Sequence, residues 1–270
     1  MADENSKAAA EDAANAVGRK PESPRVRPVY FVIAVVVFGL VIGMISIGEK
    51  SDMPTGKVLE PVAPSIFPEQ IAEFNTVVAE CNQYIAERDN NNTIDCLRKA
   101  DAIKTDLKVV SALADLYYFT GNDGEAIAYY SRAIEIEPSD TRLRYNYALS
   151  LERMNRTEDA LAQYAKAAGL ESNYTAAINN RGILLQKLKR FNESKQEFEN
   201  ALAIEPNNTI ILVNYANVLA EMNFKTEAEQ KYRKAIQLSP NNTGIYKNFG
   251  QFLFMNGRYA EAKDMFDKSV

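Results

Sequence analysis

The sequence predicts an all-α protein in which a transmembrane helix precedes an α-solenoid of helical hairpins. Three observations predict this fold: an uncharged apolar stretch near the N-terminus, a period of 34 residues that reaches the end of the chain, and two helical stripes of packing residues within each period. Repeats of this length are supersecondary units that must stack, because one unit alone cannot bury its apolar face.

Three segments are expected before the repeats. Residues 1–28 are polar and rich in alanine, which predicts a disordered tail. Residues 29–48 are the predicted anchor, because the 19 uncharged residues 29–47 would span about 28 Å as a helix, close to the thickness of a bilayer. A cleaved signal peptide is the alternative, but no small-residue cleavage site follows the stretch. Residues 49–68 contain four prolines and predict an extended linker.

The charges around the anchor predict its orientation. Four cations lie within residues 19–27, whereas only Lys50 and Lys57 follow closely. The positive-inside rule therefore places the N-terminus in the cytoplasm, so we expect a single-pass protein of the cytoplasmic (inner) membrane with its repeats outside. Gly39 and Gly43 form a G-x-x-x-G pattern that would let two such helices approach closely and form a homodimer. Incidental glycines in a simple anchor are the alternative.

Each period predicts two antiparallel helices. The units begin at residues 107, 141, 175, 209 and 243, giving 107–140, 141–174, 175–208, 209–242 and 243–270. Position 24 is aromatic in all five units: Tyr130, Tyr164, Phe198, Tyr232 and Phe266. Small residues at positions 20 and 27 share its helical stripe, and a proline at position 32 ends that helix in three units. The first helix of each unit carries its own stripe of packing residues, at positions 4, 7, 8 and 11.

This pattern resembles the tetratricopeptide repeat family, whose small residues at positions 8, 20 and 27 and aromatic residue at position 24 it matches. The resemblance implies a right-handed superhelix of hairpins that serves as an interaction scaffold for proteins or peptides. Arg144, Arg181 and Ser172 depart from the pattern and predict looser units. Residues 69–106 align only weakly and predict a divergent first hairpin, aligned from about Phe74.

No residue pattern predicts an enzyme, a metal centre or a cofactor. The chain has no histidine and no C-x-x-C pair, so the common zinc and general-base sites lack their residues. The net charge of -5 and the lack of a basic stripe argue against nucleic acid as a partner. Phosphate-binding glycine loops and nucleophile elbows are also missing from the sequence.

Two other features remain open at this stage. Cys81 and Cys96 flank the expected turn DNNNT of the divergent hairpin, which favours a disulfide in an oxidising compartment, while two buried thiols in a reducing one are the alternative. Six N-x-[ST] motifs, about three times the number expected by chance, begin at Asn91, Asn155, Asn173, Asn192, Asn207 and Asn241. We expect all six in turns, where helix capping explains an asparagine better than glycosylation does.

Position 6 predicts the binding site. It lies about 150° from the packing stripe of the first helix, so its side chain points away from the core, toward the face that lines the concave groove in this family. Asparagine occupies it in four successive units: Asn146, Asn180, Asn214 and Asn248. This row resembles the asparagine ladder of the O-linked acetylglucosamine transferase, with Ala112 interrupting it in the first unit. A solvated row without a ligand is the alternative.

The groove is also predicted to be more apolar than a solvated face requires. Its apolar candidates, at positions 5, 9, 12 and 13, are Tyr118, Phe119, Tyr145, Ile183, Val213, Phe254 and Met255. We therefore predict a scaffold for peptide segments that supports assembly, secretion or maturation of an envelope complex. A cytosol-facing organelle import receptor and an accessory subunit of a membrane enzyme are the alternatives.

Overall fold

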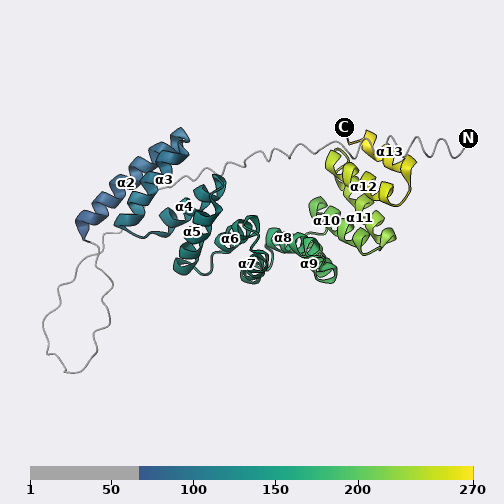
Figure 1. Cartoon of the computed structure of the whole chain (residues 1–270), viewed down its shortest axis with the longest axis horizontal. Coiled ribbons are helices and arrows are strands. Elements are labelled where there is room, and N and C mark those ends of the chain that lie inside the picture. The colour runs from purple at the N-terminus through teal and green to yellow at the C-terminus, as the bar shows by residue number, and fades with distance from the viewer. Residues whose placement is uncertain (1–66, 270) are drawn as a thin grey trace, which may run out of the picture. The chain divides into compact units, whose positions relative to one another are not determined.

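The computed structural model describes residues 67–269, which form twelve α-helices (Figure 1). This part of the chain divides into two compact units, residues 67–116 and 117–269. The predicted tail, the anchor with Gly39 and Gly43, and nearly all of the linker lie outside the described residues. Within residues 67–269, no helix is long and apolar enough to cross a membrane.

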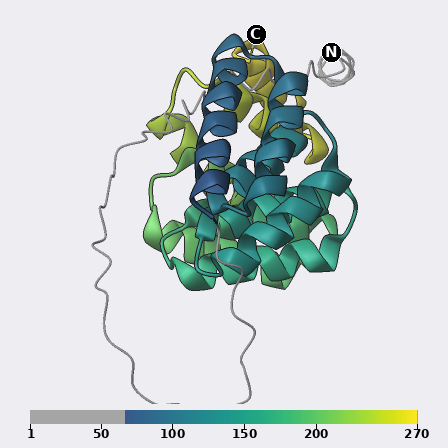
Figure 2. The ribbon, with the colours of Figure 1, turned by 90° about the vertical axis from the view of Figure 1, so that its left-hand side faces the viewer.

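The first unit contains an irregular hairpin. Helix α2 (Pro68–Glu87) and helix α3 (Asn90–Ile103) lie side by side, and α4 (Leu107–Phe119) begins after a short connection (Figure 2). Pro68, which we assigned to the linker, is the first residue of α2, where a missing backbone N–H costs nothing. The expected turn DNNNT was too long: Asp89 caps α3 by accepting a hydrogen bond from the backbone N–H of Asn92 at 3.1 Å, so the asparagines already belong to the helix.

The second unit is a regular series of hairpins that follows α5 (Asp123–Ile136). The pairs are α6 (Thr141–Arg153) with α7 (Thr157–Leu170), α8 (Thr175–Lys187) with α9 (Phe191–Ile204), α10 (Thr209–Glu221) with α11 (Lys225–Leu238), and α12 (Thr243–Met255) with α13 (Tyr259–Asp267). Figure 1 shows them as successive pairs along the chain. Every described first helix of the 34-residue units has 13 residues, as the period predicts.

Turn chemistry explains where these helices end. Position 15 has a left-handed backbone in all five units, with φ of 82° at Gly121, 57° at Asn155, 59° at Lys189, 65° at Asn223 and 75° at Gly257. Glycine and asparagine enter this region at low cost, so they end a helix well. The sequence pattern placed the turn correctly without identifying this residue.

The predicted aromatic stripe is confirmed as the core. Tyr130, Tyr164 and Phe198 are fully buried, and Tyr232 and Phe266 are 1% and 7% exposed. A methyl group at Gly182, in position 8, would lie 2.9 Å from Cζ of Phe198, so the ring occupies the space that the missing side chain leaves. Ser194, in position 20, donates a hydrogen bond to the carbonyl of Gly182 at 2.7 Å, which holds the two helices of this hairpin together.

The two arginines that break the pattern have partners. Arg144 donates to the carbonyl of Pro138 from Nε at 3.0 Å and from Nη2 at 2.7 Å. Nη1 of Arg181 lies 3.0 Å from Oε1 of Glu197, a carboxyl whose pKa is raised mainly by burial. Each cation therefore anchors its helix to a neighbouring segment in place of an apolar contact.

Candidate functional site

The candidate site is the surface formed by the first helices α6, α8, α10 and α12, which we call the first-helix face. Ion pairs and hydrogen bonds join neighbouring members of this face. Nζ of Lys187 on α8 lies 2.7 Å from Oε1 of Glu152 on α6, and Gln186 on α8 donates to Glu221 on α10. Helices α6, α8 and α10 are therefore held to one another as well as to their own hairpin partners.

A chain of side-chain hydrogen bonds crosses three of these helices. Nδ2 of Asn214 on α10 donates to Oδ1 of Asn179 on α8 at 3.0 Å, and Nδ2 of Asn179 donates to Oδ1 of the adjacent Asn180 at 3.2 Å. Nδ2 of Asn180 then donates to the hydroxyl of Tyr145 on α6 at 3.0 Å. We call these four residues the amide chain. Each group in it donates in the same direction, from α10 toward α6.

The two ends of the amide chain retain hydrogen-bonding capacity. Among the described residues, none donates to Oδ1 of Asn214, and none accepts the hydroxyl proton of Tyr145. Burial raises the pKa of Tyr145 above its ordinary value of 10.0, and the nearby Tyr174 adds to this effect, so the hydroxyl stays protonated at neutral pH. Both residues are half-buried, and the face therefore offers an acceptor at one end and a donor at the other.

A carboxylate beside the amide chain ties three helices together. Oε2 of Glu152 accepts a hydrogen bond from the buried Tyr164 of α7 at 3.2 Å, while its other oxygen pairs with Lys187. The ring of Tyr145 packs against Tyr164 and Tyr174, with centroid distances of 5.8 Å and 5.4 Å. The tyrosine that ends the amide chain is thus fixed by aromatic contacts on two sides.

The four predicted asparagines do not behave alike. Asn180 and Asn214 belong to the amide chain through Asn179, rather than forming a row of independent amides. Nδ2 of Asn248 donates to the carbonyl of Gly244 in its own helix at 2.8 Å. Asn146 is half-buried on α6 and interacts within the protein. Of the four asparagines, only Asn180 and Asn214 therefore share one hydrogen-bonded chain.

The predicted apolar residues also separate into groups. Phe119 at the end of α4 is 69% exposed, and Met255 at the end of α12 is 77% exposed. Both side chains are therefore accessible to solvent. Val213 is only 8% exposed and belongs to the core, because position 5 of α10 faces the neighbouring first helix; it lines no open groove. Ile183 and Phe254 are partly buried against the same core.

Tyr118 is covered by a cation. The guanidinium of Arg153 lies 4.6 Å from its ring centroid, and Nη1 of Arg153 donates to the carbonyl of Tyr118 at 2.9 Å. Nε of Arg153 also pairs with Asp123 at 3.1 Å. The guanidinium therefore occupies one face of the Tyr118 ring.

Sequence reasoning missed the partners across the first-helix face, including Asn179, Glu152 and Lys187. These contacts join residues that are 35 apart: Tyr145 with Asn180, Glu152 with Lys187, Asn179 with Asn214, and Gln186 with Glu221. The contact of Tyr118 on the preceding helix α4 with Arg153 on α6 has the same spacing. One period plus one residue is therefore the spacing of contact between neighbouring first helices. A search for complementary side chains at this spacing would have found them.

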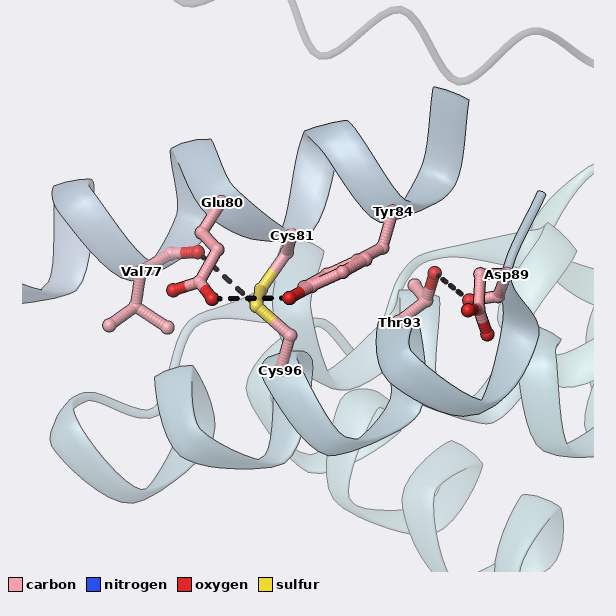
Figure 3. Close-up of a disulfide and its surroundings, with 7 residues drawn as sticks. All are labelled: Val77, Glu80, Cys81, Tyr84, Asp89, Thr93 and Cys96. Atoms are coloured by element: carbon pink, nitrogen blue, oxygen red, sulfur yellow. Dashed lines mark hydrogen bonds between the residues drawn. A yellow bond between two sulfur atoms is a disulfide. The ribbon is translucent and has the colours of Figure 1, made fainter. Parts of the chain in front are cut away.

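The two cysteines belong to the irregular hairpin of the first unit. Cys81 of α2 and Cys96 of α3 form a disulfide, with Cα atoms 5.4 Å apart and a sequence separation of 15 (Figure 3). Both residues are buried, at 0% and 3% exposure. The bond joins the two helices of the hairpin that matches the repeat pattern least. In residues 67–269, no group of three or more acidic, cysteine or histidine residues could hold a metal ion.

Comparison with known proteins identifies the repeats. Three family models described as tetratricopeptide repeat match residues 107–150, 175–208 and 231–264. A tetratricopeptide repeat protein from Parabacteroides merdae is similar in structure, with a TM-score of 0.66, 18% identity, and coverage of 72% of this chain and 78% of that chain. The search of curated proteins found no match. The chain therefore contains tetratricopeptide repeats.

Two further solved structures share the fold. Pseudomonas aeruginosa pilF has a TM-score of 0.57 and 18% identity, with 73% of this chain and 90% of that chain covered. YrrB, described as a tetratricopeptide protein with an unusual peptide-binding site, has a TM-score of 0.52 and 19% identity, with 64% and 90% covered. Identities this low are informative about fold alone.

Proposed function

We propose that this tetratricopeptide repeat protein is a membrane-anchored scaffold that binds an extended peptide segment of a partner protein on its first-helix face. The amide chain carries this proposal. Its free ends are the acceptor Oδ1 of Asn214 and the donor hydroxyl of Tyr145, the pair of groups that a peptide backbone can satisfy whatever its side chains are. Because each member of a hydrogen-bonded chain polarises the next, these end groups are better acceptors and donors than isolated side chains.

The surroundings of the amide chain favour the same ligand. Its tyrosine is fixed by aromatic neighbours and its helices by the bonds at the 35-residue spacing, so little side-chain freedom is lost on binding. Phe119 at the end of the preceding helix α4 and Met255 at the end of α12 add exposed apolar surface that side chains of a bound segment could contact. YrrB, which shares the fold, is described as having an unusual peptide-binding site.

The proposed location is the outer side of the cytoplasmic membrane, where the scaffold would support assembly, secretion or maturation of an envelope complex. The predicted anchor at residues 29–48 and the cations before it support this orientation. The disulfide adds support, because such bonds persist in oxidising compartments and are rare in the cytosol. It argues against a cytosol-facing import receptor, but it is equally compatible with an accessory subunit of a membrane enzyme.

The binding proposal is tested by changing the amide chain in the full-length protein. Tyr145→Phe removes only the terminal hydroxyl, and Asn180→Ala with Asn214→Ala removes the chain. Partner proteins captured from membranes of the source organism are identified by mass spectrometry, beside a thermal unfolding curve for each variant. We expect the same set of partners to be lost from both variants and retained by Asn200→Ala, an exposed asparagine of α9.

Unchanged capture of partners by the double variant would contradict the binding proposal. If the folded double variant captures what the wild type captures, the first-helix face is not the binding surface.

The orientation of the protein in the membrane is tested separately by adding protease to intact spheroplasts. Removal of the repeats is expected, whereas complete protection would reverse the proposed topology.

A further inference from the structure

The six N-x-[ST] motifs occupy exposed positions of the fold. Each of their asparagines is exposed. Four lie in turns as expected, but Asn91 and Asn192 lie in the first turns of α3 and α9, so our expectation that all six fall in turns was wrong for two of them. None of the six side chains makes a hydrogen bond with another described residue.

Helix capping does not account for these asparagines, contrary to our expectation from the sequence. The caps are the neighbouring residues: Oδ1 of Asn208 accepts from the backbone N–H of Ile211 at 3.2 Å, and Oδ1 of Asn242 accepts from that of Gly244 at 3.1 Å. Asn207 and Asn241 precede these caps and have no such role. Only Asn155 has a backbone reason to be asparagine, because its φ is 57°.

Three of the motifs recur at one place in the repeat. Asn173, Asn207 and Asn241 occupy position 33, in the turn between one hairpin and the next, at intervals of 34 residues. None of them lies within a helix of the first-helix face. A bulky group on these amides would therefore be attached to the turns and not to a helix of that face.

The exposure of the serine or threonine that completes each motif distinguishes these three motifs from the two at Asn91 and Asn192. Thr243 is exposed, and Thr175 and Thr209 are half-exposed, so part of each of these residues reaches the surface. The hydroxyl of Thr175 donates a hydrogen bond to Glu205, which an enzyme would have to replace. By contrast, Thr93 and Ser194, which complete the motifs at Asn91 and Asn192, are 2% and 0% exposed. In the folded protein, an enzyme that must contact both the asparagine and the hydroxyl residue can reach the three position-33 motifs and the motif of Asn155 with the half-exposed Thr157, but not the motifs at Asn91 and Asn192.

We propose that Asn173, Asn207 and Asn241 carry N-linked glycans. The co-reactant is a lipid-linked glycosyl phosphate. Nδ2 of the asparagine forms a bond to C1 of the sugar, the bond between C1 and the phosphate oxygen breaks, the amide loses one proton to a base, and the lipid phosphate leaves. Asparagines of this motif on the exterior surface of a protein are the usual acceptors. The proposal rests on the extracytoplasmic orientation proposed above.

The test uses full-length protein purified from membranes of the source organism. Its intact mass is expected to exceed the sequence mass by whole glycan increments, and peptide mass spectrometry should place sugar on Asn173, Asn207 and Asn241. Changing all three to Gln should remove these increments. Asn75→Gln, at an exposed asparagine of α2 outside any motif, is the matched control and should keep them.

Two results would overturn the proposal: all three peptides recovered unmodified, or sugar found only on Asn91, Asn155 or Asn192. Protease treatment of spheroplasts separates this failure from failure of the topology. If the repeats are unmodified and the protease removes them, glycosylation alone is rejected. Unmodified repeats that are protected would reject both the glycans and the exterior orientation.

Discussion

Replacing Gly182 by alanine should destabilise the protein, although alanine is the better helix former. A methyl group there would lie 2.9, 3.0 and 3.2 Å from Cζ, Cε1 and Cε2 of Phe198. The ring is fully buried, so neighbouring side chains prevent it from moving aside. Overpacking a core in this way costs about 1 to 3 kcal/mol. The helix gains only about 0.5 to 1 kcal/mol from losing a glycine. The cost of the clash exceeds this gain over nearly the whole of both ranges, so the expected net loss is up to about 2.5 kcal/mol.

Gly169 provides the matched control. It is exposed in α7, and a methyl group there would meet nothing within 4 Å, so Gly169→Ala should stabilise by about 0.5 to 1 kcal/mol. Urea unfolding of both variants beside the wild type measures the two free energies. The same substitution should thus have opposite signs at the two positions. Equal stabilisation at both would refute the inference that Phe198 fills the space over Gly182.

A double-mutant cycle locates the cause. Leucine at position 198 lacks the ring atoms nearest to Gly182, so the penalty of Gly182→Ala should shrink or change sign in the Phe198→Leu background. Coupling between contacting residues usually lies at about 0.5 to 3 kcal/mol. A coupling of zero would show that strain elsewhere, and not this contact, determines the effect.

Three further predictions follow from the packing, the disulfide and the charges. Phe198→Ala should cost about 3 to 5 kcal/mol through lost contacts and the cavity left behind, and a change below about 1 kcal/mol in urea unfolding would contradict the burial. Cys81→Ser should lower the free energy of unfolding by about 3 kcal/mol, the value expected for the entropy of closing a 15-residue loop. Alkylation before reduction should label neither cysteine of the wild type, and two free thiols would rule out the bond to Cys96. Hydrogen bonding to Arg258 lowers the pKa of Glu229 from 4.5, so its stabilisation is complete above that value and is lost as pH falls through the lowered pKa. Arg258→Gln should therefore reduce stability at pH 7 far more than in acid, and parallel stability profiles from pH 7 to 2 would contradict this.

The sequence was sufficient to predict features that repeat with the period. The aromatic residue at position 24 is buried in every unit because the same two helices cross at the same place in each one. The small residue at position 8 follows from this crossing. Gly182 lies under Phe198, and Gly250 lies under Phe266, whose Cε1 would be 2.8 Å from an added methyl group. Such contacts are local to one hairpin, so periodicity alone reveals them.

Features that depend on neighbouring hairpins were not predictable in the same way. The offset of one residue beyond the period arises from how first helices pack on one another, and it determines that Asn214 meets Asn179 rather than Asn180. The same packing buries Val213, which an isolated helix would expose. Turn details were missed for another reason: several adjacent asparagines compete to cap a helix, and only backbone geometry decides that Asn208, rather than Asn207, does so.

Helix α8 lies where two apolar clusters of the second unit meet. Ile178 belongs to the cluster that extends to α13, whereas Leu184 belongs to the one shared with α6 and α7. Apolar contacts are non-directional and distinguish poorly between neighbouring registers, but hydrogen bonds require donor and acceptor to be aligned. The amide chain from Asn214 through Asn179 to Tyr145 crosses this junction, so it fixes how the hairpins on either side of α8 are aligned. The residues that present the proposed peptide-binding groups thus also set their spacing, because a shifted hairpin would break the chain and separate its donor end from its acceptor end.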